Sequence, residues 1–102
     1  MAQSDGNGFT MSDAEKNGQK TLPKISFSSF ILSLYSTGLV QLGKVEDPST
    51  GGKSVNLELA QHTIDMIAML EEKTSGNLNE EETNLVKALL SELRMAYVEV
   101  RP

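Results

Sequence analysis

Three stretches with apolar residues at helical spacing, separated by two helix breaks, most constrain how this chain can fold. The first break holds Asp47-Pro48 and Gly51-Gly52, and the second is the short segment 73–79 around Gly76. Pro lacks a backbone donor and Gly disfavours the helix, so both segments interrupt it. The pattern predicts an all-α fold with helices over about 26–42, 57–74 and 80–98.

The apolar segment 25–42 follows three lysines and therefore raises the question of a signal peptide or a membrane span. Its apolar residues share one side of a helix, whereas Ser, Thr and Gln occupy the other. No A-x-A-like cleavage site follows. We therefore expect an amphipathic helix in a cytoplasmic protein, with no membrane as partner.

Two details of this first helix call for an explanation. Gly38 in its middle costs about 1 kcal/mol relative to Ala, which close packing of another helix would explain. Ser29, Ser33 and Thr37 form a strip of small side chains that either faces water or lets a helix approach. Gly43 fits the left-handed position after the last turn.

Capping residues predict where the other two helices begin and how they are joined. Asn56 is suited to cap helix 57–74, and Gly76 is suited to end it as a left-handed residue. Asn79 with Glu82 three residues later forms a capping box for helix 80–98. Because the connection is short, these two helices are expected to form an antiparallel hairpin.

Composition divides the chain into a tail and one helical domain. Residues 1–24 have isolated apolar residues without a period and are predicted to be disordered. Residues 25–102 then form a single helical domain and carry the net charge of −5. Because Lys+Arg number 9 against Asp+Glu 14, we do not expect a nucleic-acid partner.

Few residues are suited to bind metals or cofactors, and none is predicted to do so. The chain has no Cys and one His, which excludes disulfides, thiolate zinc sites and an all-histidine cage. The run Gly51-Gly52-Lys53-Ser54 is similar to the end of a phosphate-binding P-loop, but the upstream Gly and the preceding strand are missing, so we expect a turn. Glu80, Glu81 and Glu82 diverge by 100° each and are expected to cap a helix rather than bind a cation.

Three carboxylates on helix 57–74 are the residues that an enzyme could use for catalysis. Glu58, Asp65 and Glu72 fall on one strip at heptad spacing, and acid–base chemistry would require them to lie in a pocket. His62 lies beside them without a second His or a Ser, and is expected at the surface or an interface. No residue is assigned a catalytic role, and the protein is expected not to be an enzyme.

Arg94 carries a structural alternative of its own. It is either solvated or paired with Glu58 or Asp65 across the hairpin, where a partly buried ion pair, most directly that of Asp65 and Arg94, would fix the register.

Helix 57–74 is apolar over more than half of its circumference, more than one antiparallel neighbour and one flanking helix can cover. Apolar area beyond a few hundred Å² usually marks an interface. We therefore expect a homo-oligomer, most simply a two-fold dimer that buries the first two helices. The candidate interface residues are Phe30, Leu34, Ile64, Ile67, Met66 and Met69.

Three functions follow as hypotheses. The leading one is a non-enzymatic, self-associating interaction or adaptor module whose partners are itself and an unidentified protein. The alternative is a small enzyme or ligand-binding subunit that uses the three carboxylates. A regulator that contacts a basic protein through its negative surface is the third.

An ordered set of short motifs resembles a small bacterial family catalogued as domain of unknown function 1844, over residues from about 26 to 99. The motifs are Phe30-Ile-Leu-Ser-Leu34, Leu42-Gly43, Asp47-Pro48, Leu57-Glu-Leu-Ala60, Thr63-Ile-Asp65, Glu72-Lys-Thr-Ser-Gly-Asn-Leu78, Glu81-Glu82 and Leu93-Arg-Met-Ala-Tyr-Val-Glu99. Asn79 stands where the family usually has Thr, and either residue caps a helix. The resemblance implies a bacterial, cytoplasmic, all-helical protein with no assigned activity and no catalytic residues.

Overall fold

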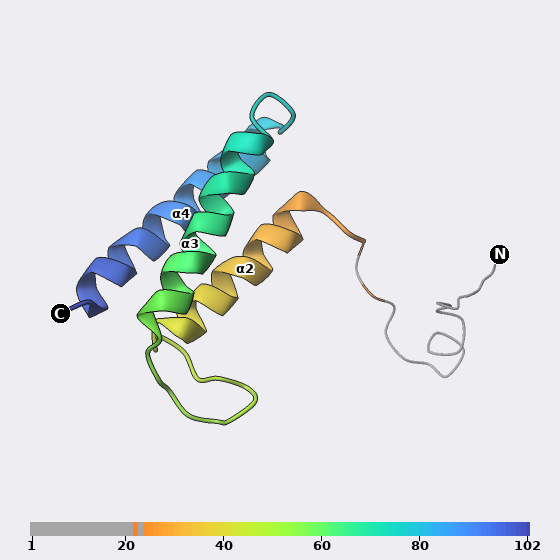
Figure 1. The fold of residues 1–102 in the computed structure, drawn as a ribbon. Helices are drawn as coiled ribbons and strands as arrows, with labels where there is room; N and C mark the ends of the chain where they lie inside the picture. Colours follow the sequence, from red (N-terminus) through yellow and green to blue (C-terminus); the bar gives the residue numbers. More distant parts are fainter. Residues whose placement is uncertain (1–21, 23) are drawn as a thin grey trace, which may run out of the picture.

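The chain folds into three α-helices that are connected by one long loop and one short turn (Figure 1). The computed structural model describes residue 22 and residues 24–102. The helices are α2 (Phe27–Gln41), α3 (Leu57–Lys73) and α4 (Glu80–Val100). The predicted all-α fold is confirmed, with each helix within two residues of its expected bounds. The tail predicted to be disordered falls almost entirely outside the described residues.

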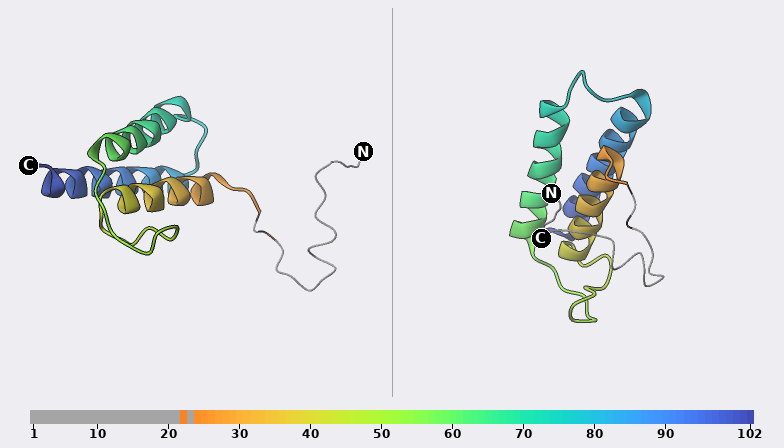
Figure 2. Two further views of the ribbon diagram at one scale, coloured as in Figure 1. Left: turned by 60° about the horizontal axis from the view of Figure 1, so that its bottom comes forward. Right: turned by 90° about the vertical axis from the view of Figure 1, so that its right-hand side faces the viewer.

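Each helix packs against the other two. In Figures 1 and 2, α3 runs antiparallel to α4, and α2 lies alongside with its direction opposite to that of α3. The short turn between α3 and α4 makes them a helical hairpin, as the sequence predicted. The three helices therefore share one core.

The core is formed by apolar side chains from all three helices. In α4 they recur at helical spacing, so that one face of the helix turns inward. The buried apolar residues are Ile31, Leu42, Ala60, Ile64, Ile67, Val86, Leu89, Leu90 and Leu93.

Gly38 lies at a close contact of α2 with the other two helices, as its position in the middle of α2 predicted. It is buried, and a Cβ atom there would stand 3.0 Å from Leu93 of α4 and 3.5 Å from Thr63 of α3. Thr63 is itself buried, and its hydroxyl donates to the side-chain oxygen of Gln41 at 2.6 Å. Because Gly38 has no side chain, α2 can pack closely against both α3 and α4 at this position.

The small-residue strip of α2 lies on its outer side. Ser29, Ser33 and Thr37 are exposed, and their hydroxyls donate to backbone oxygens one turn earlier, for example Thr37 to Ser33 at 3.0 Å. Of the two alternatives for this strip, the one that faces water therefore holds within the single chain.

The ends of α2 are closed by local hydrogen bonds. Ser26 caps its first turn in a capping box with Ser29. At the other end Gly43 has a φ of +73°, which allows its N–H to bond Val40 and the N–H of Lys44 to bond Leu39, at 3.0 and 2.9 Å. This is the Schellman pattern of hydrogen bonds.

Asparagines cap the other two helices. Asn56 accepts the N–H of Leu59 at 3.0 Å. Asn79 accepts the N–H of Glu82 at 2.7 Å, and the Glu82 carboxylate accepts the N–H of Asn79 at 3.0 Å, so the capping box is present. Gly76 has a φ of +90°, but it lies two residues after the C-cap Thr74, inside the turn.

Candidate functional site

The carboxylates of the enzyme alternative lie on the outer surface of α3. Glu58, Asp65 and Glu72 are all exposed, as is His62. Asp65 accepts a hydrogen bond from the side chain of Gln61 at 2.9 Å. Catalytic carboxylates act in concave pockets that enclose the substrate, and this strip is open to water. The arrangement gives the enzyme alternative no support.

The loop that resembles the end of a P-loop uses its own backbone donors. The N–H of Gly51 donates to the Asp47 carbonyl at 2.7 Å, and the N–H of Gly52 donates to the Thr50 hydroxyl at 3.3 Å. A phosphate cradle needs successive N–H groups that point at the ligand. The segment is a closed turn, as the sequence analysis expected.

Asp47 organises this turn through its side chain. Its carboxylate accepts the backbone N–H of Ser49 at 2.9 Å and the hydroxyl of Ser49 at 2.8 Å. Both hydrogen bonds stabilise the charged form of Asp47 and therefore lower its pKa below its usual value. The bond from the backbone N–H has the larger effect and the bond from the hydroxyl the smaller one.

The acidic start of α4 is occupied by capping. Glu82 closes the capping box with Asn79, while Glu80 and Glu81 are exposed. Across residues 24–102, no group of three or more His, Asp or Glu residues is arranged to hold a metal ion.

The predicted interface residues divide into three groups. Phe30 and Met69 are 49% and 46% exposed. Leu34 and Met66 are half-buried. Ile64 and Ile67 lie in the core of the single chain and have no surface to offer a second copy, because α2 and α4 cover them.

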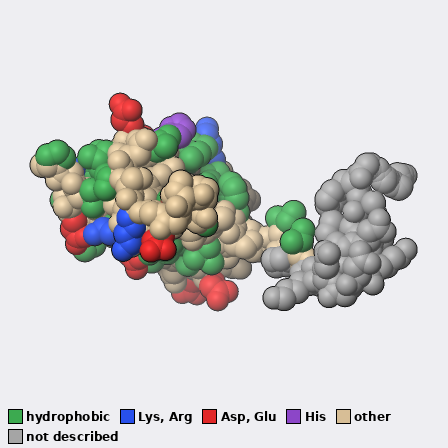
Figure 3. Space-filling view, turned by 90° about the horizontal axis from the view of Figure 1, so that it is seen from below, with side chains coloured by type: hydrophobic (Ala, Val, Ile, Leu, Met, Phe, Trp, Pro, Cys, Tyr) green, Lys and Arg blue, Asp and Glu red, His purple; other side chains and the backbone are tan. Residues whose placement is uncertain are grey.

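α3 is nevertheless not enclosed by its own chain. Leu59, which the sequence analysis did not single out, is 49% exposed on this helix together with Met69. Seen from below in Figure 3, hydrophobic side chains lie in several places among tan polar and backbone atoms and charged side chains. Large apolar side chains are also exposed on α2 and α4, so the exposed apolar surface is not concentrated on α3.

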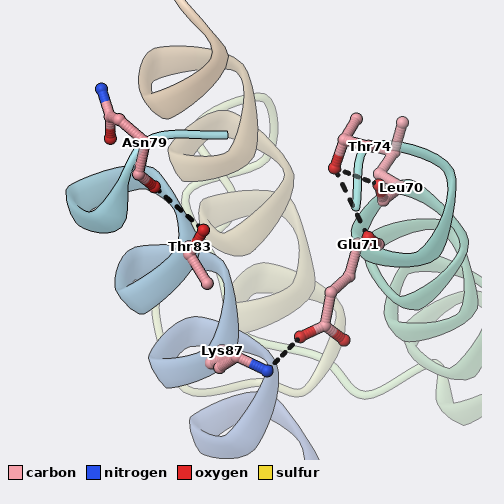
Figure 4. A network of polar contacts seen from close by, with 6 residues as sticks. All are labelled: Leu70, Glu71, Thr74, Asn79, Thr83 and Lys87. Carbon is pink, nitrogen blue, oxygen red and sulfur yellow. Dashed lines mark hydrogen bonds and ion pairs between the residues drawn. The ribbon is translucent and has the colours of Figure 1, made fainter. Parts of the chain in front are cut away.

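The hairpin is bridged by an ion pair between α3 and α4. Lys87 Nζ of α4 lies 3.5 Å from Glu71 Oε2 of α3, and Figure 4 shows the contact between the two side chains. The alternative pair of Asp65 and Arg94 is not formed, since Asp65 bonds Gln61 and Arg94 takes part in neither of the two ion pairs of the described chain. Arg94 is exposed, in agreement with the solvated alternative.

A polar contact between α2 and α4 was missed by the sequence analysis. The Tyr35 hydroxyl donates to Glu92 Oε1 at 2.5 Å. This hydrogen bond, together with partial desolvation and the negative charge of Glu92, raises the pKa of Tyr35 above its usual value. The two residues lie 57 positions apart in the chain, and neither has a local signal that marks it as a partner.

A groove follows the outer side of α4. It has a volume of about 570 Å³, and buried Leu90 is among its lining residues. Met95 and Val98, which are 64% and 55% exposed, also line it. The sequence indicates this groove only weakly, because Met95 and Val98 are the two apolar residues on a helix face that is otherwise mostly polar. Its other lining residues are Glu71, Lys87, Ser91, Arg94 and Glu99.

None of the helices that the structure describes has the length and apolar character to cross a membrane. No curated protein and no solved structure matches the chain. A family described as a domain of unknown function (DUF1844) matches residues 24–99, which confirms the resemblance found in the motifs. With most of its length covered by that match, the chain belongs to the DUF1844 family.

Proposed function

We propose that this protein is a non-enzymatic interaction module that associates with itself. The observation that supports the proposal is the apolar surface left open on every helix. The large apolar side chains exposed on the helices are Phe30, Leu32, Leu59, Met69, Met95 and Val98.

The small size of the domain makes this exposed apolar surface important for stability. A domain built from three short helices has a small core, and its stability alone is marginal. Apolar side chains at an interface with a second copy leave water and add to that stability. A symmetric dimer is the simplest assembly that covers the same surface on both chains.

The placement of polar groups favours a module over an enzyme. Glu58, Asp65 and Glu72 lie open to water rather than in a pocket that could enclose a substrate. The same open surface is also suited to a second protein, which is the adaptor form of this proposal.

A bacterial cytoplasmic location is part of the proposal. The cytoplasmic part is supported by the segment 25–42, the candidate export signal, because most of it forms α2 and it contributes Ile31 and Leu42 to the core. The bacterial part is supported by the resemblance of the motifs to a bacterial family. Fractionation of cells that produce a tagged full chain tests it: recovery from the periplasm or the medium would contradict it.

The measurement that tests self-association is the mass of the full chain in native buffer. Light scattering or sedimentation equilibrium from micromolar to millimolar concentration should show a species heavier than one chain, with a share that rises with concentration. A folded chain that stays monomeric over the whole range would overturn the proposal.

A further inference from the structure

The outward face of α4 carries a row of uncharged residues. Asn84, Ala88, Ser91, Met95 and Val98 are all exposed, and they follow one another at intervals of four and three residues. An average interval of 3.5 residues is the spacing of the residues that form the seam of a coiled coil. We call these five residues the α4 seam.

Basic residues border the α4 seam on the side of α3. Lys87 lies there, as its ion pair with Glu71 of α3 shows. Arg94 follows seven residues later, which places it on the same edge of the helix. Both side chains are exposed, and within the described chain Arg94 has no ion-pair partner. Lys87 and Arg94 are the basic edge.

Acidic residues border the α4 seam on the side of α2. Glu92 lies there, because it accepts the hydroxyl of Tyr35 of α2. Glu99 follows seven residues later and pairs with Lys44, just after α2, at 2.9 Å. Both carboxylates are exposed. Glu92 and Glu99 are the acidic edge, and the uncharged seam thus separates two edges of opposite sign.

The groove of about 570 Å³ extends across this face from the basic edge. Ser91, Met95 and Val98 of the α4 seam line it, together with Lys87 and Arg94 of the basic edge and Glu99 of the acidic edge. Helices that pair in this way insert side chains of one chain into hollows of the other. The face therefore combines a seam, a hollow beside it and two charged edges.

We propose that the α4 seam packs against the α4 seam of a second copy, with the two α4 helices parallel and in register. This inference rests on the proposed self-association and names its interface. In this arrangement the bodies formed by α2 and α3 lie on opposite sides of the paired helices, because the seam faces away from both.

Charge selects the parallel direction. In a parallel pair, a residue on one edge of a helix meets the opposite edge of its neighbour five residues further along. Lys87 then meets Glu92 of the second copy, and Arg94 meets Glu99. In an antiparallel pair each edge meets itself, so the basic residues would face basic residues and the acidic residues acidic ones. Like charges at such positions disfavour pairing.

The side chains of the α4 seam match this role. Ala88 and Ser91 are small and let the helices approach closely, while Met95 and Val98 supply apolar contact near the C-terminal end. The existing ion pairs of Lys87 and Glu99 are exposed, and exposed pairs are weak, so both residues remain available to a second partner.

Cysteine crosslinking tests the interface, because the chain contains no Cys of its own. Asn84→Cys and Ser91→Cys place one thiol each on the α4 seam, one heptad apart. A disulfide needs Cα atoms about 4.4–6.8 Å apart. We expect both variants to form disulfide-linked dimers under mild oxidation, whereas Ser36→Cys, exposed on α2, stays uncrosslinked at the same concentration.

The two α4 positions distinguish the two directions. If antiparallel helices crossed at Ser91, the Asn84 positions would be about 21 Å apart at 1.5 Å of rise per residue. Crosslinking of only one of the two variants therefore overturns the parallel arrangement. Crosslinking of Leu59→Cys with neither α4 variant, in a chain that is dimeric by mass, overturns the α4 interface and leaves self-association standing. A monomeric wild-type chain overturns both.

A charge exchange gives a second test that does not depend on thiol chemistry. The variant with Lys87→Glu and Arg94→Glu has two acidic edges, and the variant with Glu92→Lys and Glu99→Lys has two basic ones. Each alone should have the mass of one chain, and their equimolar mixture should have the mass of two. Circular dichroism checks that each variant keeps its helices. A dimer of either variant alone, or a mixture of monomers, contradicts the inference.

Discussion

Gly38 of α2 packs directly against Leu93 of α4: a Cβ atom at position 38 would stand 3.0 Å from Leu93 Cδ2 and 3.1 Å from Leu93 Cδ1. Leu93 is completely buried and therefore has little freedom to move aside. The distance between α2 and α4 is thus set by the absence of a side chain in α2.

Replacement of Gly38 by Ala should destabilise the fold. Ala gains about 1 kcal/mol of helix propensity over Gly. The added methyl group overpacks the contact with Leu93, which typically costs about 1–3 kcal/mol. We expect a net loss of about 1 kcal/mol in the free energy of unfolding, measured by urea denaturation. Gly52→Ala is the control, since nothing lies within 4 Å of a Cβ atom there. A Gly38→Ala chain more stable than wild type would contradict the close contact.

The hydrogen bond between Thr63 and Gln41 should be measurable as a coupling energy. Thr63→Val keeps the shape of the buried side chain and removes its hydroxyl, which should cost about 1 kcal/mol. Gln41→Met removes the acceptor from the other side. In a double-mutant cycle the two changes should cost less together than the sum of the single effects. Strict additivity in the denaturation energies would show that the bond contributes nothing.

Loss of the cap at Asn79 should shorten or fray α4 at its start. Asn79→Ala removes the oxygen that accepts the Glu82 N–H, and loss of such a cap costs about 1 kcal/mol. Asn79→Thr retains a capping oxygen and is the matched control, with an expected loss of a few tenths of a kcal/mol. Thermal denaturation of the three proteins compares them. Equal stability of the Ala and Thr variants would mean that the capping box is not formed in solution.

Tyr35 should titrate above its ordinary pKa of 10.0, because its hydroxyl donates to Glu92. The folded state then favours the neutral phenol. The stabilisation is fully present below the unfolded pKa and is lost as the pH rises through the folded pKa. An ultraviolet titration of a Tyr97→Phe chain isolates this group. Glu92→Ala in that background should lower the pKa toward 10.0, and an unchanged pKa would contradict the hydrogen bond.

Local signals were sufficient to predict the helices and their ends. The capping box of Asn79 and Glu82 acts within four residues, and the helix break at Asp47-Pro48 acts through the backbone alone, so both can be recognised from short segments. The cost of Gly38 in a helix interior correctly indicated a close helix contact, although its partner Leu93 could not be identified, because that contact depends on how the helices cross.

Side-chain partners between helices were less accessible to prediction. The ion pair of Glu71 and Lys87 brings Ile64, seven residues before Glu71, level with Arg94, seven residues after Lys87. Asp65 is therefore close to Arg94 in height along the hairpin. Asp65 nevertheless lies on the exposed face of α3. Periodicity likewise marked Ile64 and Ile67 as apolar but could not tell whether their own chain or a second copy covers them. The answer depends on tertiary packing.

The long connection between α2 and α3 is closed at its base. The N–H of Asn56 donates to the Gln41 carbonyl at 2.8 Å, and the Asp47 turn is held by its own hydrogen bonds. The entropy of closing a loop grows only slowly with length, by about 0.6 kcal/mol for each doubling. A foreign peptide or a fluorescent label inserted between Gly51 and Gly52 would therefore be displayed at one tip of the molecule, where engineers could attach it without rebuilding the helices.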